Sequence, residues 1–424
     1  MNAASRPRFP SAQALSSPTR PAGHLDPIMP PGAPRSARIL LGLLSRLAQG
    51  RLLLTLPDGQ TMTYGSGEPC AQMRLRNWNL FAAVLARGDI GFAESWIAGD
   101  WHSDRLIDLI DLMIANRAVL DRAVYGHGLM RFVDRLRHLL NRNTRAGSRR
   151  NIHAHYDLGN AFYRLWLDDT MTYSSAVFGG NAALPLAAAQ EAKYQRILDR
   201  LALQTGDKVL EIGCGWGGFA EQAARAGLQV KGLTLSTEQQ AFAQQRLQGA
   251  GLAHNAQCVL QDYRDETARY DGIVSIEMFE AVGEAYWPQY FATLARSMAR
   301  GARAVVQTIV IDNTLFERYR RGTDFIQQYV FPGGMLPSPD AFIAQARRAG
   351  LEVIDRFDFG QDYAHTLKLW REAFVSRLDA VRAQGFDDRF IRTWEFYLAY
   401  CEAAFRHRNT DVVQFTLAHA GTPA

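Results

Sequence analysis

The sequence contains no run of about 18 uncharged apolar residues, which is the least that a membrane-spanning helix requires. Hydrophobic residues nevertheless make up 47% of the chain, and 424 residues are enough to bury a full core in roughly two domains. The sequence therefore predicts an ordinary globular protein, and we expect any contact with a membrane to be peripheral.

Cysteine is scarce, with only Cys70, Cys214, Cys258 and Cys401 spread along the chain. This spacing excludes paired metal ligands and a tight disulfide framework, and it favours a reducing cytoplasm. The first 36 residues lack a long apolar stretch, so they do not resemble a secretory signal. They hold eight of the 16 prolines, and residues 1–36 are predicted to form a disordered tail.

The formal net charge is only +5, but seven arginines and a single acid, Asp134, lie between Arg131 and Arg150. Such a stretch attracts anionic surfaces, which favours a patch that faces phospholipid. A solvated helix face followed by a basic linker explains it equally well. Nucleic acid is disfavoured because the stretch lacks the interleaved aromatics of a single-strand binding groove.

Two short strands, residues 52–56 and 60–64, are predicted around Pro57-Asp58-Gly59, since Asp-Gly supplies the positive φ that a hairpin turn needs. Helices are predicted at residues 78–86, where Gly88 acts as a stop, and at residues 104–114. These elements begin a small N-terminal domain.

Five short apolar runs alternate with helical stretches after a predicted helix at residues 186–203. The runs are residues 209–212, 229–233, 256–260, 272–275 and 304–309, and the stretches between them are as long as parallel crossovers require. This alternation predicts a doubly wound α/β sheet.

A glycine-rich turn follows the first of these runs. Gly213, Gly215 and Gly217 let the backbone approach a ligand closely, and their spacing differs from the Gly-x-Gly-x-x-Gly of nucleotide-binding dehydrogenases. Glu211 precedes the glycines, where it would repel a pyrophosphate but attract the ammonium of a methionine moiety. The turn therefore predicts a cradle for S-adenosylmethionine; a tight turn that binds nothing is the alternative.

The ends of the next two strands carry further candidates. Ser236 and Gln239 have the spacing of a capping box, and Gln239 also lies where ribose hydroxyls arrive in such folds, so both roles stay open. After the third strand, Asp262 offers an acceptor for an adenine amino group and Tyr263 a ring to stack on it. A plain surface loop is the alternative there.

Several segments along the chain are specific enough to suggest a family. They are GFAESW (91–96), HYDLGN (155–160), YS (173–174), EIGCGWGG (211–218), LQDYRD (260–265), MFE (278–280), FPGGMLPS (331–338) and YLAYC (397–401), the last followed by FR (405–406).

These segments resemble the cyclopropane fatty acid synthase family, which includes cyclopropane-fatty-acyl-phospholipid synthases and mycolic acid cyclopropane synthases. The likeness runs from about Leu52 to His419. It implies a class I, Rossmann-like S-adenosylmethionine methyltransferase domain at residues 146–420 and a small helical and hairpin domain, associated with lipid or membrane, at residues 37–145. By the same resemblance Tyr173, Ser174, Thr234 and Leu235 are cofactor-binding residues.

The resemblance implies chemistry on the cis double bond of an acyl chain in a phospholipid. An alkene carbon attacks the sulfonium methyl and leaves a carbocation, and a base then removes a proton from the new methyl so that a ring closes. Family members hold a bicarbonate there with a Cys, a Glu, a His and a Tyr. Glu280 and Tyr363 match the Glu and the Tyr, whereas Ser175 and Gln307 stand where the family has Cys and His.

Each of these candidates has a structural alternative. Neither Ser175 nor Gln307 can form a thiolate or an imidazolium, although both can hydrogen-bond. Glu280 fits a helix-start carboxylate, because Glu277 and Glu284 make its segment acidic, and Tyr363 fits a core aromatic. Cys401 is either a catalytic residue or a buried core thiol. Three aromatic residues suit either an acyl channel or core packing: Phe325, Tyr329 and Phe331.

By resemblance His153 and His155 lie in a lid over the cofactor, and without paired Cys or carboxylate spacing we expect no metal there. The predicted function is methylene or methyl transfer to unsaturated phospholipid chains by a cytoplasmic enzyme at the inner face of the membrane. A ring is the favoured product; a methylene or methyl-branched chain is the alternative that Ser175 and Gln307 motivate. Two rivals are a cofactor-binding regulator without turnover and methylation of a soluble metabolite. A homodimer is also among the expected assemblies.

Overall fold

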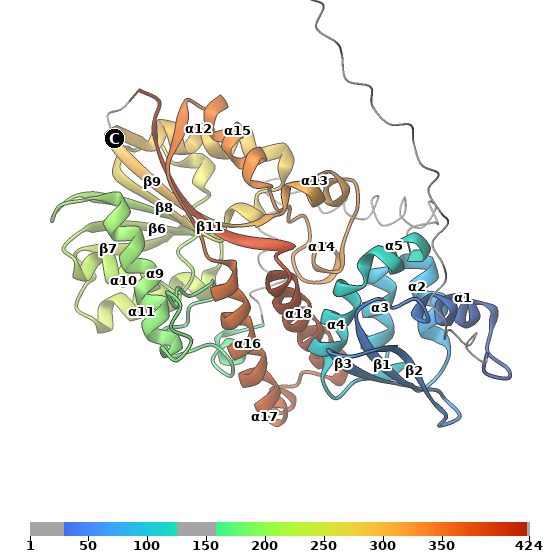
Figure 1. The fold of residues 1–424 in the computed structure, drawn as a ribbon. Coiled ribbons are helices and arrows are strands. Elements are labelled where there is room, and N and C mark those ends of the chain that lie inside the picture. The colour runs from blue at the N-terminus through green and yellow to red at the C-terminus, as the bar shows by residue number, and fades with distance from the viewer. Residues whose placement is uncertain (1–28, 125–157, 422–424) are drawn as a thin grey trace, which may run out of the picture.

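The computed structural model describes residues 29–124 and 158–421, with the backbone alone for residues 121–124. A small N-terminal unit lies at one end of a larger α/β unit (Figure 1). None of the helices in the described ranges is long and apolar enough to cross a bilayer. The predicted Pro-rich tail and the Arg-rich stretch fall mostly or wholly outside these ranges.

The N-terminal unit contains a four-stranded sheet in the order β2-β1-β3-β4. Its strands are β1 (Gly50–Thr55), β2 (Thr61–Ser66), β3 (Cys70–Leu75) and β4 (Trp101–His102). The predicted hairpin is confirmed: β1 and β2 are antiparallel, and Gly59 turns the chain with a φ of 88°. The parallel pairing of β1 with β3 was not predicted.

Five helices cover this sheet: α1 (Arg35–Leu44), α2 (Asn79–Arg87), α3 (Asp89–Ile97), α4 (Leu106–Ala115) and α5 (Arg117–Val124). The two predicted helices are confirmed as α2 and α4. Gly88 ends α2 with a φ of 63°, and α3 starts directly after it. Because α1 begins at Arg35, the predicted tail boundary at residue 36 falls inside its first turn.

The larger unit is built on a seven-stranded sheet in the order β10-β11-β9-β8-β5-β6-β7. The strands are β5 (Lys208–Ile212), β6 (Gln229–Thr234), β7 (Ala256–Leu260), β8 (Tyr270–Ile276), β9 (Met298–Ile311), β10 (Leu351–Asp358) and β11 (Thr410–His419). All five predicted strands are present, and only β11 runs antiparallel to its neighbours. The predicted doubly wound α/β sheet is confirmed.

Helices pack on both faces of this sheet, which is why its central strands are almost continuously apolar. On one face α9 (Leu186–Leu201), α10 (Gly218–Arg225) and α11 (Thr237–Gly249) enclose a core with Val209 and Val274. On the other face α12 (Trp287–Ser297) and α15 (Pro339–Arg348) pack over Leu210 and Ile273. The remaining helices are α8 (Asn160–Tyr163), α13 (Asn313–Arg320), α14 (Phe325–Tyr329), α16 (Gly360–Ser376), α17 (Leu378–Ala383) and α18 (Asp388–Arg406).

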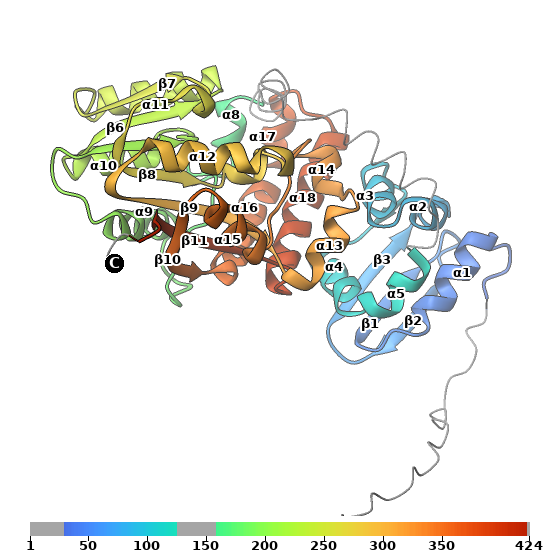
Figure 2. The same cartoon turned by 90° about the horizontal axis from the view of Figure 1, so that it is seen from above.

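Helix α18 joins the two units, as Figure 2 shows from above. The Trp96 indole of α3 donates a hydrogen bond to the Arg392 carbonyl (3.0 Å), and the Arg392 guanidinium lies over the Trp96 ring. At the other end of α18, Arg406 forms an ion pair with Asp111 of α4 at 2.7 Å. One apolar core runs through both units, so the N-terminal unit has a fixed position beside the larger unit.

Candidate active site

A cavity of about 170 Å³ opens at the carboxyl ends of β5, β6 and β8, where doubly wound folds bind their ligands. Every residue predicted to bind the cofactor lines this cavity except Gly217. The lining residues from that set are Tyr173, Ser174, Glu211, Gly213, Gly215, Thr234, Leu235, Gln239, Asp262 and Tyr263. We call it the cofactor cavity.

The glycines of the turn have different tasks. Gly213 has a φ of 86°, and a Cβ there would lie 2.9 Å from the Met278 side chain at the floor of the cavity. Gly217, with a φ of 81°, precedes α10, and its Cβ would lie 2.9 Å from that of Ala243 on α11. Gly217 therefore permits the close approach of α10 to α11. It faces α11 and does not line the cavity.

Glu211 faces the cofactor cavity from the end of β5 and is only 2% exposed. Its Oε2 atom is buried and has no hydrogen-bond partner among the described residues. Burial raises the pKa of this carboxyl above its ordinary value. A buried acceptor of this kind is costly unless a donor arrives, and the ammonium of S-adenosylmethionine is a suitable donor. The residues present therefore fit the cofactor.

The predicted cap of α11 forms: Ser236 Oγ accepts a hydrogen bond from Gln239 N at 3.2 Å. The Gln239 side chain accepts a second bond from Thr234 Oγ1 at 3.0 Å and also lines the cavity. On the opposite side, the Asp262 carboxylate accepts two side-chain bonds from Arg264, at 2.8 and 2.6 Å. Arg264 thus fixes the orientation of the carboxylate that was predicted to meet adenine.

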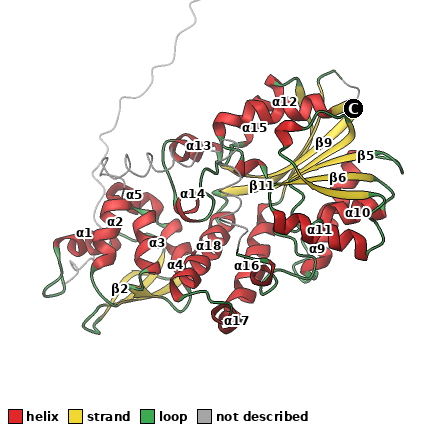
Figure 3. Cartoon of the chain, turned by 180° about the vertical axis from the view of Figure 1, so that it is seen from behind, coloured by secondary structure: helices red, strands yellow, loops and turns green. Residues whose placement is uncertain are grey.

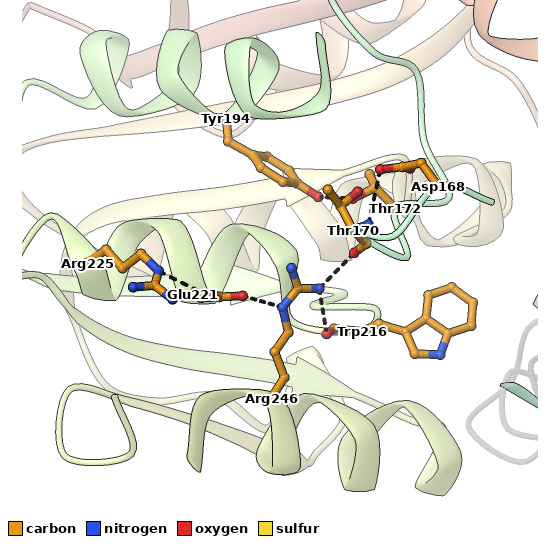
Figure 4. A network of polar contacts seen from close by, with 8 residues as sticks. All are labelled: Asp168, Thr170, Thr172, Tyr194, Trp216, Glu221, Arg225 and Arg246. Carbon is orange, nitrogen blue, oxygen red and sulfur yellow. Dashed lines mark hydrogen bonds and ion pairs between the residues drawn. The ribbon is translucent and has the colours of Figure 1, made fainter. Parts of the chain in front are cut away.

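The segment that leads into Tyr173 is tied to the helices after the glycine turn (Figure 4). Arg246 of α11 forms an ion pair with Glu221 of α10 and donates to the Thr170 carbonyl at 2.7 Å. The Thr172 hydroxyl is 3.1 Å from the Tyr194 hydroxyl of α9. These contacts hold residues 170–174 as one wall of the cofactor cavity.

A carboxylate that the sequence analysis mentioned only as an acidic neighbour, Glu277, lies at the centre of the site. It follows β8 directly, lines the cofactor cavity and has a φ of 48°. This left-handed conformation favours glycine and is uncommon for a side chain such as glutamate. Strained residues of this kind cluster at functional sites, and the strain is one sign that the carboxylate is needed here.

Three of the four predicted bicarbonate ligands converge on Glu277. Its Oε1 accepts hydrogen bonds from Ser175 N (2.8 Å) and Gln307 Nε2 (2.7 Å). Its Oε2 accepts one from the Tyr363 hydroxyl (2.7 Å). Ser175 contributes its backbone, since its hydroxyl donates to the Ala176 carbonyl instead. The side-chain carboxylate of Glu277 thus occupies the set of donors that was predicted to hold an anion.

The fourth predicted ligand, Glu280, is not part of this convergence. Its carboxylate accepts a hydrogen bond from Ile309 N, and burial together with the negative charge of Glu277 raises its pKa to about 8. Glu280 is therefore neutral near pH 7. Burial also raises the pKa of Glu277, but the Tyr363 hydroxyl and the charge of Lys193 oppose the shift and favour its ionised form.

A relay of amides fixes Gln307, which is fully buried. Gln307 Oε1 accepts from Gln414 Nε2 at 3.0 Å, and Gln414 Oε1 accepts from Arg196 at 2.7 Å. Arg196 in turn forms an ion pair with Asp355 on β10. Because the amide oxygen of Gln307 is engaged by Gln414, its NH₂ group must face Glu277.

Lys193 of α9 is a second functional candidate that the sequence analysis missed. It is 0% exposed, and its Nζ donates to Ser174 Oγ and to Gln190 Oε1, each at 2.6 Å. Gln190 also donates to the Ser174 carbonyl at 2.9 Å. Burial lowers the pKa of Lys193 to about 7, while the charges of Glu277, Asp168 and Glu211 oppose the shift. Lys193 therefore holds the wall at Ser174 and counters the buried acids.

Tyr363 and Cys401 do not line the cofactor cavity. Tyr363 is 5% exposed and packs against Phe405, with ring centroids 4.5 Å apart. Burial raises the pKa of the Cys401 thiol well above its ordinary value, so it is protonated at neutral pH. One turn before it, the Tyr397 hydroxyl is 2.6 Å from that of Tyr173. A catalytic role for Cys401 stays a prediction.

The remaining candidates do not enter the cofactor cavity. Phe325 and Tyr329 stack on each other, and Phe325 packs edge-on against Phe396 of α18, with centroids 4.9 Å apart. Phe331 packs against Tyr397. His153 and His155 of the predicted lid lie outside the described residues, as do Arg131 to Arg150.

The fold and the cavity at the strand ends define a class I methyltransferase. The model of the mycolic acid cyclopropane synthetase family matches residues 143–415, and the chain belongs to this family. The family's members are S-adenosylmethionine-dependent methyltransferases, and the relatives described next act on lipids.

Relatives of known name match over most of the chain. The tuberculostearic acid methyltransferase UfaA1 of Mycobacterium tuberculosis is 40% identical over 93% of this chain and 94% of its own. The cyclopropane-fatty-acyl-phospholipid synthase of Escherichia coli is 35% identical over 82% of this chain and 88% of its own.

Two solved structures resemble the larger unit. The cyclopropane synthase MmaA2 from Mycobacterium tuberculosis aligns with a TM-score of 0.59 at 32% identity, covering 64% of this chain and 98% of that one. The mycolic acid cyclopropane synthase CmaA1, complexed with SAH and CTAB, aligns with a TM-score of 0.58 at 31% identity, covering 63% and 97%.

Glu211→Gln tests the fit of the cavity to the cofactor. The change keeps the shape but removes the carboxylate that pairs with the ammonium, so we expect the affinity for S-adenosylmethionine to fall by about tenfold to a hundredfold. Isothermal titration calorimetry measures it. Glu238→Gln, an exposed residue on α11 outside the cavity lining, is the matched control and should bind normally. Equal affinities in all three proteins would refute the assignment.

Proposed function

We propose that this enzyme transfers the methyl group of S-adenosylmethionine to the double bond of an unsaturated acyl chain in a phospholipid, and that Glu277 accepts the proton that the product must lose. The observation that carries the proposal is the half-buried carboxylate of Glu277, held by three donors at the edge of the cofactor cavity. Family membership and the names of its lipid-acting relatives support the substrate class.

When bound, S-adenosylmethionine supplies an electrophilic methyl group. An alkene carbon of the lipid that takes up this methyl leaves a cation on the neighbouring carbon, and the chain becomes neutral again only by losing a proton. The methyl carries protons that a base in the same cavity can reach. Glu277 is the carboxylate in that lining with an ionised form favoured by three hydrogen bonds and by Lys193.

The built-in carboxylate takes the role that the resemblance assigns to bicarbonate. A bound bicarbonate would need the donors of Ser175, Gln307 and Tyr363, and Glu277 already engages all three. We therefore propose that the reaction needs S-adenosylmethionine but no bicarbonate. Tyr363 and Gln307 act as positioning residues that keep the Glu277 carboxylate aimed and ionised.

The favoured product is a methylene branch. Before Glu277 removes a proton, the cation relaxes by a hydride shift from the methylated carbon to its neighbour. That shift converts a secondary cation into a more stable tertiary one, and loss of a methyl proton to Glu277 then forms a C=CH₂ group on the open chain. The sequence is balanced without a reductant, which a saturated methyl branch would require.

A cyclopropane ring is the second candidate. Glu277 can remove the methyl proton before the hydride shift, in which case the methyl carbon closes on the cation. The cyclopropane synthases among the named relatives favour this outcome. We further propose that the enzyme works peripherally at the cytoplasmic face of the membrane, which the basic stretch of the sequence supports; a homodimer also stays a proposal.

Ozonolysis of the product separates the two candidates, which have equal mass. Lipids from a host expressing the enzyme are extracted before and after ozone treatment and analysed by mass spectrometry. We expect an added carbon that ozone removes, leaving a ketone on the chain, because ozone cleaves a methylene group. An ozone-resistant product would identify the ring, and absence of any added carbon would contradict methyl transfer to lipid.

Substitution of Glu277 tests the base. Glu277→Gln keeps the size but cannot accept a proton, so kcat should fall by about 10²- to 10⁴-fold. Glu277→Gly suits the left-handed backbone and leaves a space lined by donors, so we expect added bicarbonate or formate to restore part of its activity but none of the Gln variant's. Near wild-type activity of Glu277→Gln, measured by methyl incorporation, would exclude Glu277 as the base.

The pH dependence of kcat tests Lys193. Glu277 must be ionised, so activity is present above its raised pKa and is lost as pH falls through it; the acid limb should therefore lie above the ordinary glutamate value of 4.5. Lys193→Met removes the opposing positive charge and should move this limb upward by about one pH unit. Lys231→Met, which breaks an ion pair with Glu266 outside the cavity, is the control. An unmoved limb in Lys193→Met would contradict the role.

A further inference from the structure

A second and larger cavity, about 380 Å³, lies between the two units of the protein. Residues of helices α1 to α5 and strands β1 and β3 line one side, and residues of α13, α18 and the segment before α14 line the other. Figure 3 shows α13, α14 and α18 next to the helices of the N-terminal unit. We call it the interdomain chamber. Its volume falls within the range of about 300–1,000 Å³ that is usual for ligand pockets.

Most of the chamber wall is aliphatic. Leu52, Leu54 and Ile110 line it from the N-terminal unit, and Leu315 and Phe396 from the larger unit. Protein interiors normally close-pack such side chains and leave few voids larger than a water molecule. Two apolar surfaces that meet around a space of this size indicate a binding site for an apolar group.

The chamber and the cofactor cavity have no lining residue in common within the described ranges. Helix α18 lies between the chamber and the Glu277 cluster: Tyr400 lines the chamber, and the next residue, Cys401, is close enough to Tyr363 to affect its pKa. A group held in the chamber is therefore near the reacting centre but does not meet Glu277.

Part of the chamber wall is polar. Four charged residues line this part: Arg117, Arg318, Asp89 and Asp324. The charges of Arg117 and Arg318 lower the pKa of Asp89, and the charge of Asp89 raises that of Asp324. These four residues therefore lie close together, and the rest of the chamber is chiefly hydrocarbon. A ligand that matches the larger, apolar part is an alkyl chain.

We propose that the interdomain chamber holds the second, nonreacting acyl chain of the phospholipid whose other chain is methylated. The inference rests on the proposed function, because only a two-chain lipid brings a chain that does not react. A phospholipid that is drawn out of the bilayer to reach Glu277 also brings its second chain, whose exposure to water is unfavourable. The chamber provides an apolar place for it on the other side of α18.

The test compares a two-chain and a one-chain lipid. Ala404 on α18 and Ala86 on α2 line opposite walls of the chamber, and Ala404→Phe and Ala86→Phe each fill part of it. The matched control is Ala383→Phe, on the exposed side of α17. The substrates are dioleoyl phosphatidylglycerol and 1-oleoyl lysophosphatidylglycerol in micelles of the same detergent, and kcat/KM for methyl incorporation is measured for both.

We expect each chamber variant to lose about tenfold or more in kcat/KM for the two-chain lipid and to keep the wild-type value for the one-chain lipid. Calorimetric affinity for S-adenosylmethionine should be unchanged in both variants, which shows that they are folded. Unchanged rates with both lipids, or an equal loss with both, would overturn the inference. If the wild-type enzyme methylates neither lipid, the proposed function itself fails, and the inference falls with it.

Discussion

The site depends on one half-buried carboxylate, Glu277, and on the donors that favour its charged form. A carboxylate away from bulk water is stable in its ionised form only when hydrogen bonds and nearby positive charge replace the lost hydration. Ser175, Gln307 and Tyr363 supply the hydrogen bonds, and Lys193 supplies the charge. Removing any of them leaves this carboxylate with fewer partners, which favours its protonated form.

These partners come from segments that are far apart in the chain. Ser175 precedes α9, Glu277 follows β8, Gln307 lies within β9, and Tyr363 lies in the first turn of α16. The parallel register of β8 and β9 pairs Ile276 with Gln307, so the sheet itself places the amide beside the next residue, Glu277. The relay through Gln414 and Arg196 then extends this order to β11 and α9. The catalytic geometry is thus a property of the assembled sheet.

Local patterns explain what could be predicted from sequence. The five parallel strands are short apolar runs because helices bury both of their faces, and the cofactor residues sit at the ends of those strands by a general rule of the fold. Strand β10 was not predicted because its residues alternate between buried and exposed at the edge of the sheet. Helix α9 was predicted, but Lys193 appeared to be an ordinary polar position on it.

The central residue escaped prediction for a physical reason. The sequence around Glu277 and Glu280 is acidic throughout, and nothing local tells which carboxylate enters the site. The left-handed backbone that turns Glu277 toward Ser175 and Gln307 depends on pairing with β9 and becomes visible only in the fold. A carboxylate directly after a predicted parallel strand was the one available signal, because ligands gather at that edge of the sheet.

We propose that the base is a side chain of the protein itself, Glu277. The most direct measurement is the rate of methyl transfer by the wild-type enzyme in buffer depleted of carbon dioxide and bicarbonate, followed by the same assay with bicarbonate added back. We predict the same rate in both conditions, because Glu277 fills the anion position. A rate that collapses on depletion and returns with bicarbonate would contradict the role assigned to Glu277.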